Sequence, residues 1–173
     1  MTVTSVKKDT EALTMNVTAE FNATPERIWQ LWADPRQLER WWGPPGYPAT
    51  FTSHDLRRGG RVAYHMTGPD GEQPRGWWEI DEADPPRRLV FRDGFADDEG
   101  KPNPDFPVTT VLVTIEDLGR GQTQMSIQSQ YPDAQAMEQL LAMGMEQGLT
   151  AAVGQIDAIL AEDAMTSTSV PSH

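Results

Sequence analysis

The sequence has no cysteine, few histidines and no long apolar run, and each absence excludes a class of function. Without cysteine there is no disulfide, no thiolate metal site and no cysteine nucleophile. The three histidines show no His-x-x-x-His spacing, and no phosphate-binding loop occurs, so we expect neither a metal nor an organic cofactor. Because no segment could span a bilayer and the first residues lack a signal-peptide core, the expected location is the cytoplasm.

Positive charge is also scarce, whereas large polarisable side chains are abundant. The 14 Lys and Arg residues face 26 Asp and Glu residues, which gives a formal net charge of -12 at pH 7. Such an acidic chain is a poor partner for nucleic acid or for an anionic membrane surface. By contrast, 173 residues include six Trp and eight Met, residue types that fill cores and line sites for apolar ligands.

Alternating apolar and polar residues predict a series of strands joined by tight turns. In the first strand Met15, Val17 and Phe21 share one face. Thr24 and Asp34, each followed by proline, predict two short helices directly after this strand. Consecutive strands with short connections form an antiparallel meander. The expected strands are residues 14–21, 50–56, 61–67, 75–81, 88–92, 109–115 and 122–130.

A long amphipathic helix is expected over residues 133–162, with Asp133 as its N-cap. Its apolar stripe is bulky at both ends and small in the middle, where Gly144 and Gly148 lie. Glycine destabilises a helix interior by about 1 kcal/mol relative to alanine. Close packing, a bend, or a space left between helix and sheet would each account for these glycines.

Together these elements predict an α+β domain of the helix-grip kind over residues 13–163. In it a curved seven-stranded antiparallel sheet wraps around the long C-terminal helix, and two short helices follow strand 1. Residues 1–12 show no period and are expected to form a flexible arm. Residues 164–173 are polar, and we expect a disordered tail.

Several motifs, in order along the chain, resemble one family. Residues 23–29 (Ala-Thr-Pro-Glu-Arg-Ile-Trp) resemble its opening, and residues 38–43 (Leu-Glu-Arg-Trp-Trp-Gly) its Trp-Trp-Gly loop. Residues 55–61 resemble its Asp-aliphatic-Arg-Pro-Gly-Gly turn, with Arg58 where proline is usual. By these motifs the chain is similar to the homologues of the activator of heat-shock-protein-90 ATPase, within the START-like (SRPBCC, pollen-allergen-like) superfamily.

The resemblance implies a deep cavity between the sheet and the long helix. Members of the superfamily include lipid carriers, hormone receptors, polyketide cyclases and co-chaperones, and relatives often pair, which leaves a homodimer open. We do not expect a chaperone partner, because the eukaryotic co-chaperone binds mainly through a separate N-terminal domain. The resemblance therefore implies a small apolar molecule as the partner.

The candidate ligand-binding residues are large apolar side chains with a few polar groups. His54 is the least certain of them: it faces the cavity, or is a core histidine bonded to a backbone carbonyl, or points to solvent if the strand is shifted by one residue. Tyr64 and Ser129 are inward by parity. The full set is Trp32, Trp42, His54, Tyr64, Met66, Trp78, Phe91, Phe106, Met125, Ser129, Met137, Leu141, Met145 and Gly148.

Three functions are compatible with this reading. The first is binding of a small hydrophobic or aromatic ligand in the internal cavity. The second is a cofactor-independent enzyme of the cyclase or aldol type, with His54 as the base and Tyr64 polarising a carbonyl. The third is a chaperone-interacting protein. The sequence favours the first and identifies no catalytic residue beyond this conditional pair.

Overall fold

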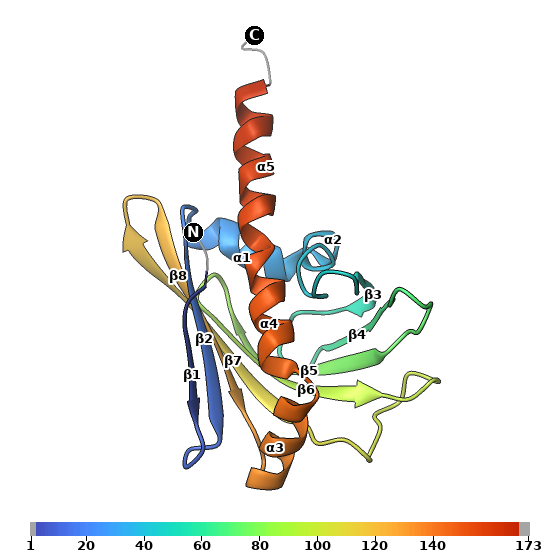
Figure 1. Cartoon of the computed structure of the whole chain (residues 1–173). Helices are drawn as coiled ribbons and strands as arrows, with labels where there is room; N and C mark the ends of the chain where they lie inside the picture. Colours follow the sequence, from blue (N-terminus) through green and yellow to red (C-terminus); the bar gives the residue numbers. More distant parts are fainter. Residues whose placement is uncertain (1–2, 170–173) are drawn as a thin grey trace.

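A single antiparallel sheet curls around the helices (Figure 1). The computed structural model describes residues 3–169. The eight strands follow the order β1-β2-β8-β7-β6-β5-β4-β3, so β1 and β3 are the sheet edges. The strands are β1 (Val3–Asp9), β2 (Thr14–Phe21), β3 (Ala49–His54), β4 (Arg61–Met66), β5 (Arg75–Asp84), β6 (Arg88–Ala96), β7 (Thr109–Gly119) and β8 (Gln122–Gln130).

The helices lie on the concave side of this sheet. The short helices α1 (Pro25–Ala33) and α2 (Pro35–Leu38) follow β2, with Thr24 and Asp34 as N-caps as predicted. The C-terminal helical region comprises α3 (Ala134–Ala142), α4 (Met145–Gly154) and α5 (Ile156–Ser169). In Figure 1, α3 and α4 cross the concave face, and α5 continues past α1 beyond the sheet.

The structure confirms the α+β helix-grip class and differs from the expectation at both ends of the chain. The sheet has eight strands rather than seven, because residues expected in a flexible arm form β1 and pair with β2. Residues up to 169, expected in a disordered tail, continue α5, and residues 170–173 lie outside the described residues.

The long helix is not continuous. It breaks after α3, where Gly144 adopts φ +89°, and again at Gln155. An L-residue pays about 1 to 2 kcal/mol in this left-handed region, whereas glycine adopts it freely. The small middle of the stripe therefore includes a bend, which was one of the alternatives open from the sequence.

The core is dominated by aromatic side chains from the sheet and the short helices. Trp32 is fully buried, and its ring centroid lies 4.8 Å from that of Trp41 and 6.0 Å from that of Trp78. Trp78 stacks on Phe91 at 4.2 Å. The Trp41 indole N–H donates to the Leu31 carbonyl oxygen at 2.9 Å, which satisfies its one polar group.

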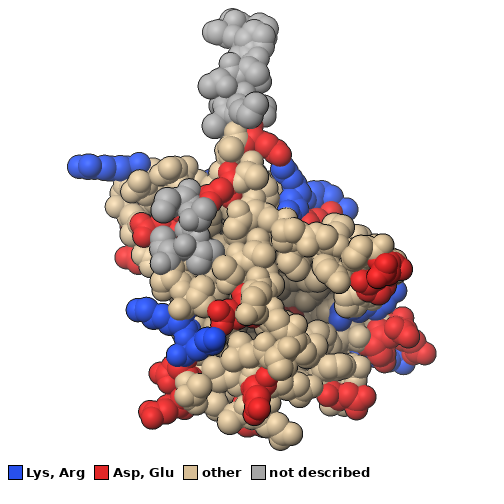
Figure 2. Space-filling model, viewed as in Figure 1, with Lys and Arg blue, Asp and Glu red and all other residues tan. Residues whose placement is uncertain are grey.

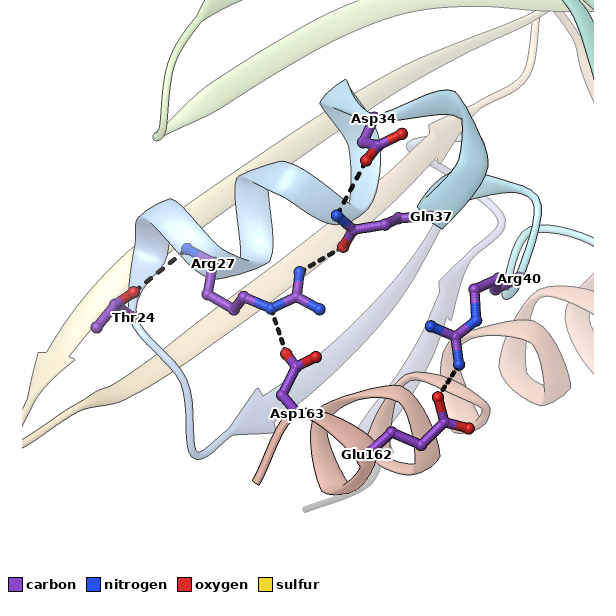
Figure 3. Close-up of polar contacts among 7 residues, drawn as sticks. All are labelled: Thr24, Arg27, Asp34, Gln37, Arg40, Glu162 and Asp163. Carbon is purple, nitrogen blue, oxygen red and sulfur yellow. Dashed lines mark hydrogen bonds and ion pairs between the residues drawn. The ribbon is translucent and has the colours of Figure 1, made fainter. Parts of the chain in front are cut away.

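Ion pairs connect the C-terminal helix to the short helices (Figure 3). The Arg27 guanidinium contacts both Asp163 on α5 and Gln37 on α2. Arg40 forms an ion pair with Glu162. Solvent-exposed pairs contribute at most about 1 kcal/mol each. They orient α5 over α1, while the apolar residues Ile156 and Ile159 supply its burial.

Candidate functional site

A cavity of about 320 Å³ lies between the concave face of the sheet and the α3–α4 junction. Its walls are mainly aromatic and aliphatic, with a few polar groups. The lining residues are Met15, Trp42, Pro44, Tyr47, Tyr64, Met66, Pro74, Arg75, Asp93, Gly94, Phe95, Thr109, Val111, Ile127, Ser129, Tyr131, Leu140, Met143, Gly144, Met145, Gly148 and Leu149.

Glycine leaves space on the helix side of this cavity. Gly148 lies in its wall, and a Cβ added there would meet no atom within 4 Å. The break at Gly144 brings Met143 and Met145 to the same wall. The small middle of the helix is therefore both a bend and a boundary of the open space.

A cluster of polar side chains lies in the sheet wall of the cavity. The Tyr64 hydroxyl donates to Oδ1 of Asp93 at 3.4 Å. The indole N–H groups of Trp42 and Trp78 approach this pair, yet both are buried without a hydrogen-bond partner among the described residues. Buried unpaired donors are uncommon because each loses its hydration without compensation. The cluster therefore retains unused hydrogen-bonding capacity.

The position of Tyr64 depends on a glycine in the neighbouring strand. Gly76 pairs with Tyr64 across β4 and β5. A Cβ at position 76 would lie 2.4 Å from the Tyr64 hydroxyl oxygen, a separation that atoms do not tolerate. The missing side chain lets the tyrosine ring lie across β5 toward Asp93 on β6.

Burial determines the electrostatics of this cluster. It raises the pKa of Asp93 from 3.8 to about 7, although the hydrogen bond from Tyr64 acts in the opposite direction. Burial also raises the pKa of Tyr64 well above its ordinary value, and the nearby Asp93 adds to this. Asp93 is half-buried and lines the cavity. No described Lys or Arg forms an ion pair with it.

His54 is half-buried and does not line the cavity. A β-bulge between Phe51 and Ser53 shifts the register of β3, so that His54 pairs with Val62. Its Nε2 lies 2.9 Å from the Trp32 carbonyl oxygen and donates to it. This is the core-histidine alternative, and it removes His54 from the role of base in the cyclase hypothesis.

The remaining predicted residues divide between the cavity and the core. Trp42, Tyr64, Met66, Ser129, Met145 and Gly148 line the cavity. Five others do not line the cavity and are buried in the core: Trp32, Trp78, Phe91, Met125 and Met137. Leu141 packs against the core. Phe106 does not line the cavity, but its ring lies 4.9 Å from that of Phe95, which does.

The sequence reasoning missed Asp93, because it ended the strand at residue 92 and assigned Asp93 to a loop. The strand period contained the signal: Leu89 and Phe91 face inward, and Asp93 is the next residue on that side. The aromatic residues Tyr47, Phe95 and Tyr131 were also missed. They lie outside the alternating segments from which inward residues were chosen.

Neither a metal-binding cluster nor a membrane-spanning helix is found among the described residues. Within residues 5–163 no group of three or more His, Asp or Glu side chains could hold a metal ion. No helix in the described part of the chain is long and apolar enough to cross a bilayer.

A curved antiparallel sheet packed around a C-terminal helix, with a cavity between them, defines the helix-grip class. The model of one family, the Activator of Hsp90 ATPase homolog 1-like proteins, matches residues 22–161. The chain belongs to this family, within the START-like (SRPBCC) superfamily. None of the curated proteins compared with it matches.

Solved structures agree with this assignment. Protein Ms6760 from Mycobacterium smegmatis is 48% identical with a TM-score of 0.84, and 99% of each chain is covered. A protein from Arthrobacter aurescens is 49% identical with a TM-score of 0.89, covering 93% of each. The AHSA1 protein from Silicibacter pomeroyi is 21% identical with a TM-score of 0.71, covers 87% of this chain and 99% of its own, and shows the fold alone.

Proposed function

We propose that the protein binds a small, largely apolar molecule in the cavity between the sheet and the α3–α4 junction. The observation that carries this proposal is the partly open cavity of about 320 Å³ with mainly apolar walls and a few convergent polar groups. Small-molecule sites have this composition, and their usual volumes begin at about 300 Å³.

The energetics of the walls support an occupant. Side chains that face an empty space lose the dispersion contacts that a close-packed interior supplies. A ligand restores those contacts with Trp42, Met66 and Met145. Binding also removes apolar surface of the ligand from water, which is favourable. An apolar body of modest size therefore gains free energy at this site without rearranging the sheet.

A glycine substitution tests the proposal. Adamantan-1-ol serves as the probe, because it is compact, apolar and carries a single hydroxyl group. Gly148→Leu should place a side chain in the open space and weaken binding at least about tenfold in isothermal titration calorimetry. Leucine also has the higher helix propensity, by about 0.8 kcal/mol, so lost binding would not reflect an unfolded helix.

The matched control is Gly154→Leu. Gly154 belongs to the same helix, is exposed, and also has no atom within 4 Å of an added Cβ, but it does not line the cavity. The affinity of the Gly154→Leu protein for adamantan-1-ol should stay within about twofold of that of the wild type. Equal affinities of Gly148→Leu and the wild type, or no binding by either, would refute the proposed site.

A second function is favoured by one observation, the Asp93–Tyr64 pair inside the cavity. A carboxyl group with a pKa of about 7 has the proton affinity of a general base at neutral pH. We infer that an enzyme of the cyclase or aldol type would use Asp93 as the base in place of His54, with Tyr64 polarising a carbonyl.

The test of this second function is exchange of the α protons of 2-tetralone in D₂O. Asp93→Asn should abolish catalysed exchange while retaining binding of 2-tetralone. Exchange that is no faster with the wild type than without protein would exclude this function for the probe.

The family description refers to activation of the Hsp90 ATPase, so chaperone association is a third hypothesis. The described surface gives it little support. Its large exposed apolar side chains are three: Val108 directly before β7, Leu118 near the end of β7, and Met143 between α3 and α4. Unchanged chaperone ATPase rates with added protein would exclude it.

A further inference from the structure

Asp93 is an acidic residue in a cavity wall whose other residues are neutral apart from Arg75. The Tyr64 hydroxyl donates a hydrogen bond to it and the Trp78 indole lies near it, and both groups are neutral. No described cation pairs with it. A buried carboxylate without a positive partner is costly, because desolvation is uncompensated. The site is therefore incomplete for the ionised form of Asp93.

The walls around this acid are rich in aromatic rings. Trp42, Tyr47, Tyr64, Phe95 and Tyr131 all line the cavity. The faces of such rings attract cations, by about 0.5 to 2 kcal/mol each when the cation is desolvated. Aromatic walls combined with one carboxylate suit an organic cation better than an anion or a neutral hydrocarbon.

The other charged groups near the cavity do not alter this preference. Arg75, at the start of β5, also lines the cavity. It forms no ion pair with Asp93 among the described residues. The charge of Glu146 on α4 helps to raise the pKa of Tyr131, after the larger effect of burial. Glu146 also forms an ion pair with Lys8 at 2.6 Å. The face seen in Figure 2 carries acidic side chains across it and basic ones at its edges. This distribution attracts cations toward the protein.

We propose that the cavity selects an apolar molecule that carries one protonated amine, and that the ammonium group pairs with the Asp93 carboxylate. This rests on the proposed function, since it names the ligand class of the same cavity. The amine donates hydrogen bonds to Asp93 and supplies the missing counter-charge, while the aromatic rings contact its apolar body. Tyr64 continues to donate to Asp93 and orients the carboxylate.

Proton balance makes the proposal testable by pH. In the free protein Asp93 ionises with a pKa of about 7. Amine binding requires the carboxylate, so well below pH 7 each binding event releases close to one proton to solvent. Tyr64 and Tyr131 stay neutral between pH 5.5 and 8, because burial raises the pKa of both. His54 and His65 lie outside the cavity wall. Binding therefore tightens as the pH rises through 7.

Three matched probes test this: 1-adamantylamine, adamantan-1-ol and adamantane-1-carboxylate. At pH 8 the amine should bind at least about tenfold more tightly than the alcohol, and the carboxylate more weakly than both. Lowering the pH to 5.5 should weaken amine binding by about tenfold or more and leave alcohol binding within about twofold. Calorimetry in two buffers of different ionisation enthalpy should detect the released proton.

Two variants separate the amine preference from binding itself. Asp93→Asn keeps the size of the side chain and an acceptor for Tyr64, so it should bind amine and alcohol equally and lose the pH dependence. Asp98→Asn makes the same charge change at an exposed position outside the cavity, and should keep the preference. Equal binding of all three probes, blocked by Gly148→Leu, would overturn the amine proposal and leave the proposed function intact. No binding of any probe would overturn both.

Discussion

The replacement of Asp93 by asparagine should stabilise the protein at alkaline pH. The folded structure holds the proton of Asp93 with a pKa of about 7, against 3.8 for the ordinary carboxyl group. Because this pKa is raised on folding, its contribution to stability is complete below pH 3.8 and is lost as the pH rises to about 7. Asparagine does not ionise and avoids this loss.

The size of this stabilisation depends on how much of the pH range lies below the pKa of Asp93 in the folded protein. Each pH unit in this interval costs the folded wild type about 1.4 kcal/mol relative to the variant. Between pH 5 and pH 8 only the two units up to about 7 count, which gives about 2 to 3 kcal/mol. The Tyr64 hydroxyl still has an oxygen acceptor in the variant, so the geometry of the cluster is retained.

Urea denaturation of both proteins at pH 5, 6, 7 and 8 measures this difference. The difference in unfolding free energy, variant minus wild type, should grow across the series and level off above pH 7. Comparing the two proteins at the same pH cancels every other titrating group. A difference that is independent of pH, or a variant that is less stable at pH 8, would refute the placement of Asp93 in a desolvated wall.

Three further substitutions test the fold that holds the cavity. Gly144→Ala should cost about 1 to 2 kcal/mol in urea denaturation, from the positive φ alone, because an added Cβ there meets no atom within 4 Å. Trp32→Ala, in the fully buried aromatic core, should cost about 3 to 5 kcal/mol in the same assay. Arg40→Ala removes an ion pair with Glu162 and should cost less than about 1 kcal/mol, decreasing further in high salt. A Gly144→Ala protein as stable as the wild type would contradict the helix break, and a large Arg40→Ala effect would contradict the minor role of that pair.

Much of the fold could be predicted because local signals and packing agree in it. The alternation in β2 became the buried row Met15, Val17, Ala19 and Phe21. Asp133 caps α3 by accepting from the Ala136 N–H at 2.7 Å, as its position before the helical stripe indicated. These features depend on residues close in sequence, and such residues carry their own structural preference.

The first strand and the break in the C-terminal helix were less predictable. Residues of β1 have no alternating pattern, because an edge strand pairs through its backbone and need not bury one face. The break at Gly144 was one of several explanations for a helical glycine, and the sequence alone does not distinguish a bend from close packing.

The site was predicted only in part, for reasons of register. Parity assigned Tyr64 and Ser129 to the cavity, and both line it. A β-bulge in β3 altered the phase of His54, and a bulge is not visible as a break in alternation over so short a strand. Asp93 was missed because an acidic residue beside glycine suggests a turn, whereas here it continues β6 and lines the cavity.

The most direct test of the cavity as a binding site is a crystal structure of the protein with 1-bromoadamantane. Bromine scatters anomalously, so its position does not depend on interpretation of weak density. The account predicts one anomalous peak within the walls formed by Trp42, Tyr64 and Gly148, and its loss in Gly148→Leu. A peak on the outer surface of the sheet, or an empty cavity at saturating probe, would contradict it.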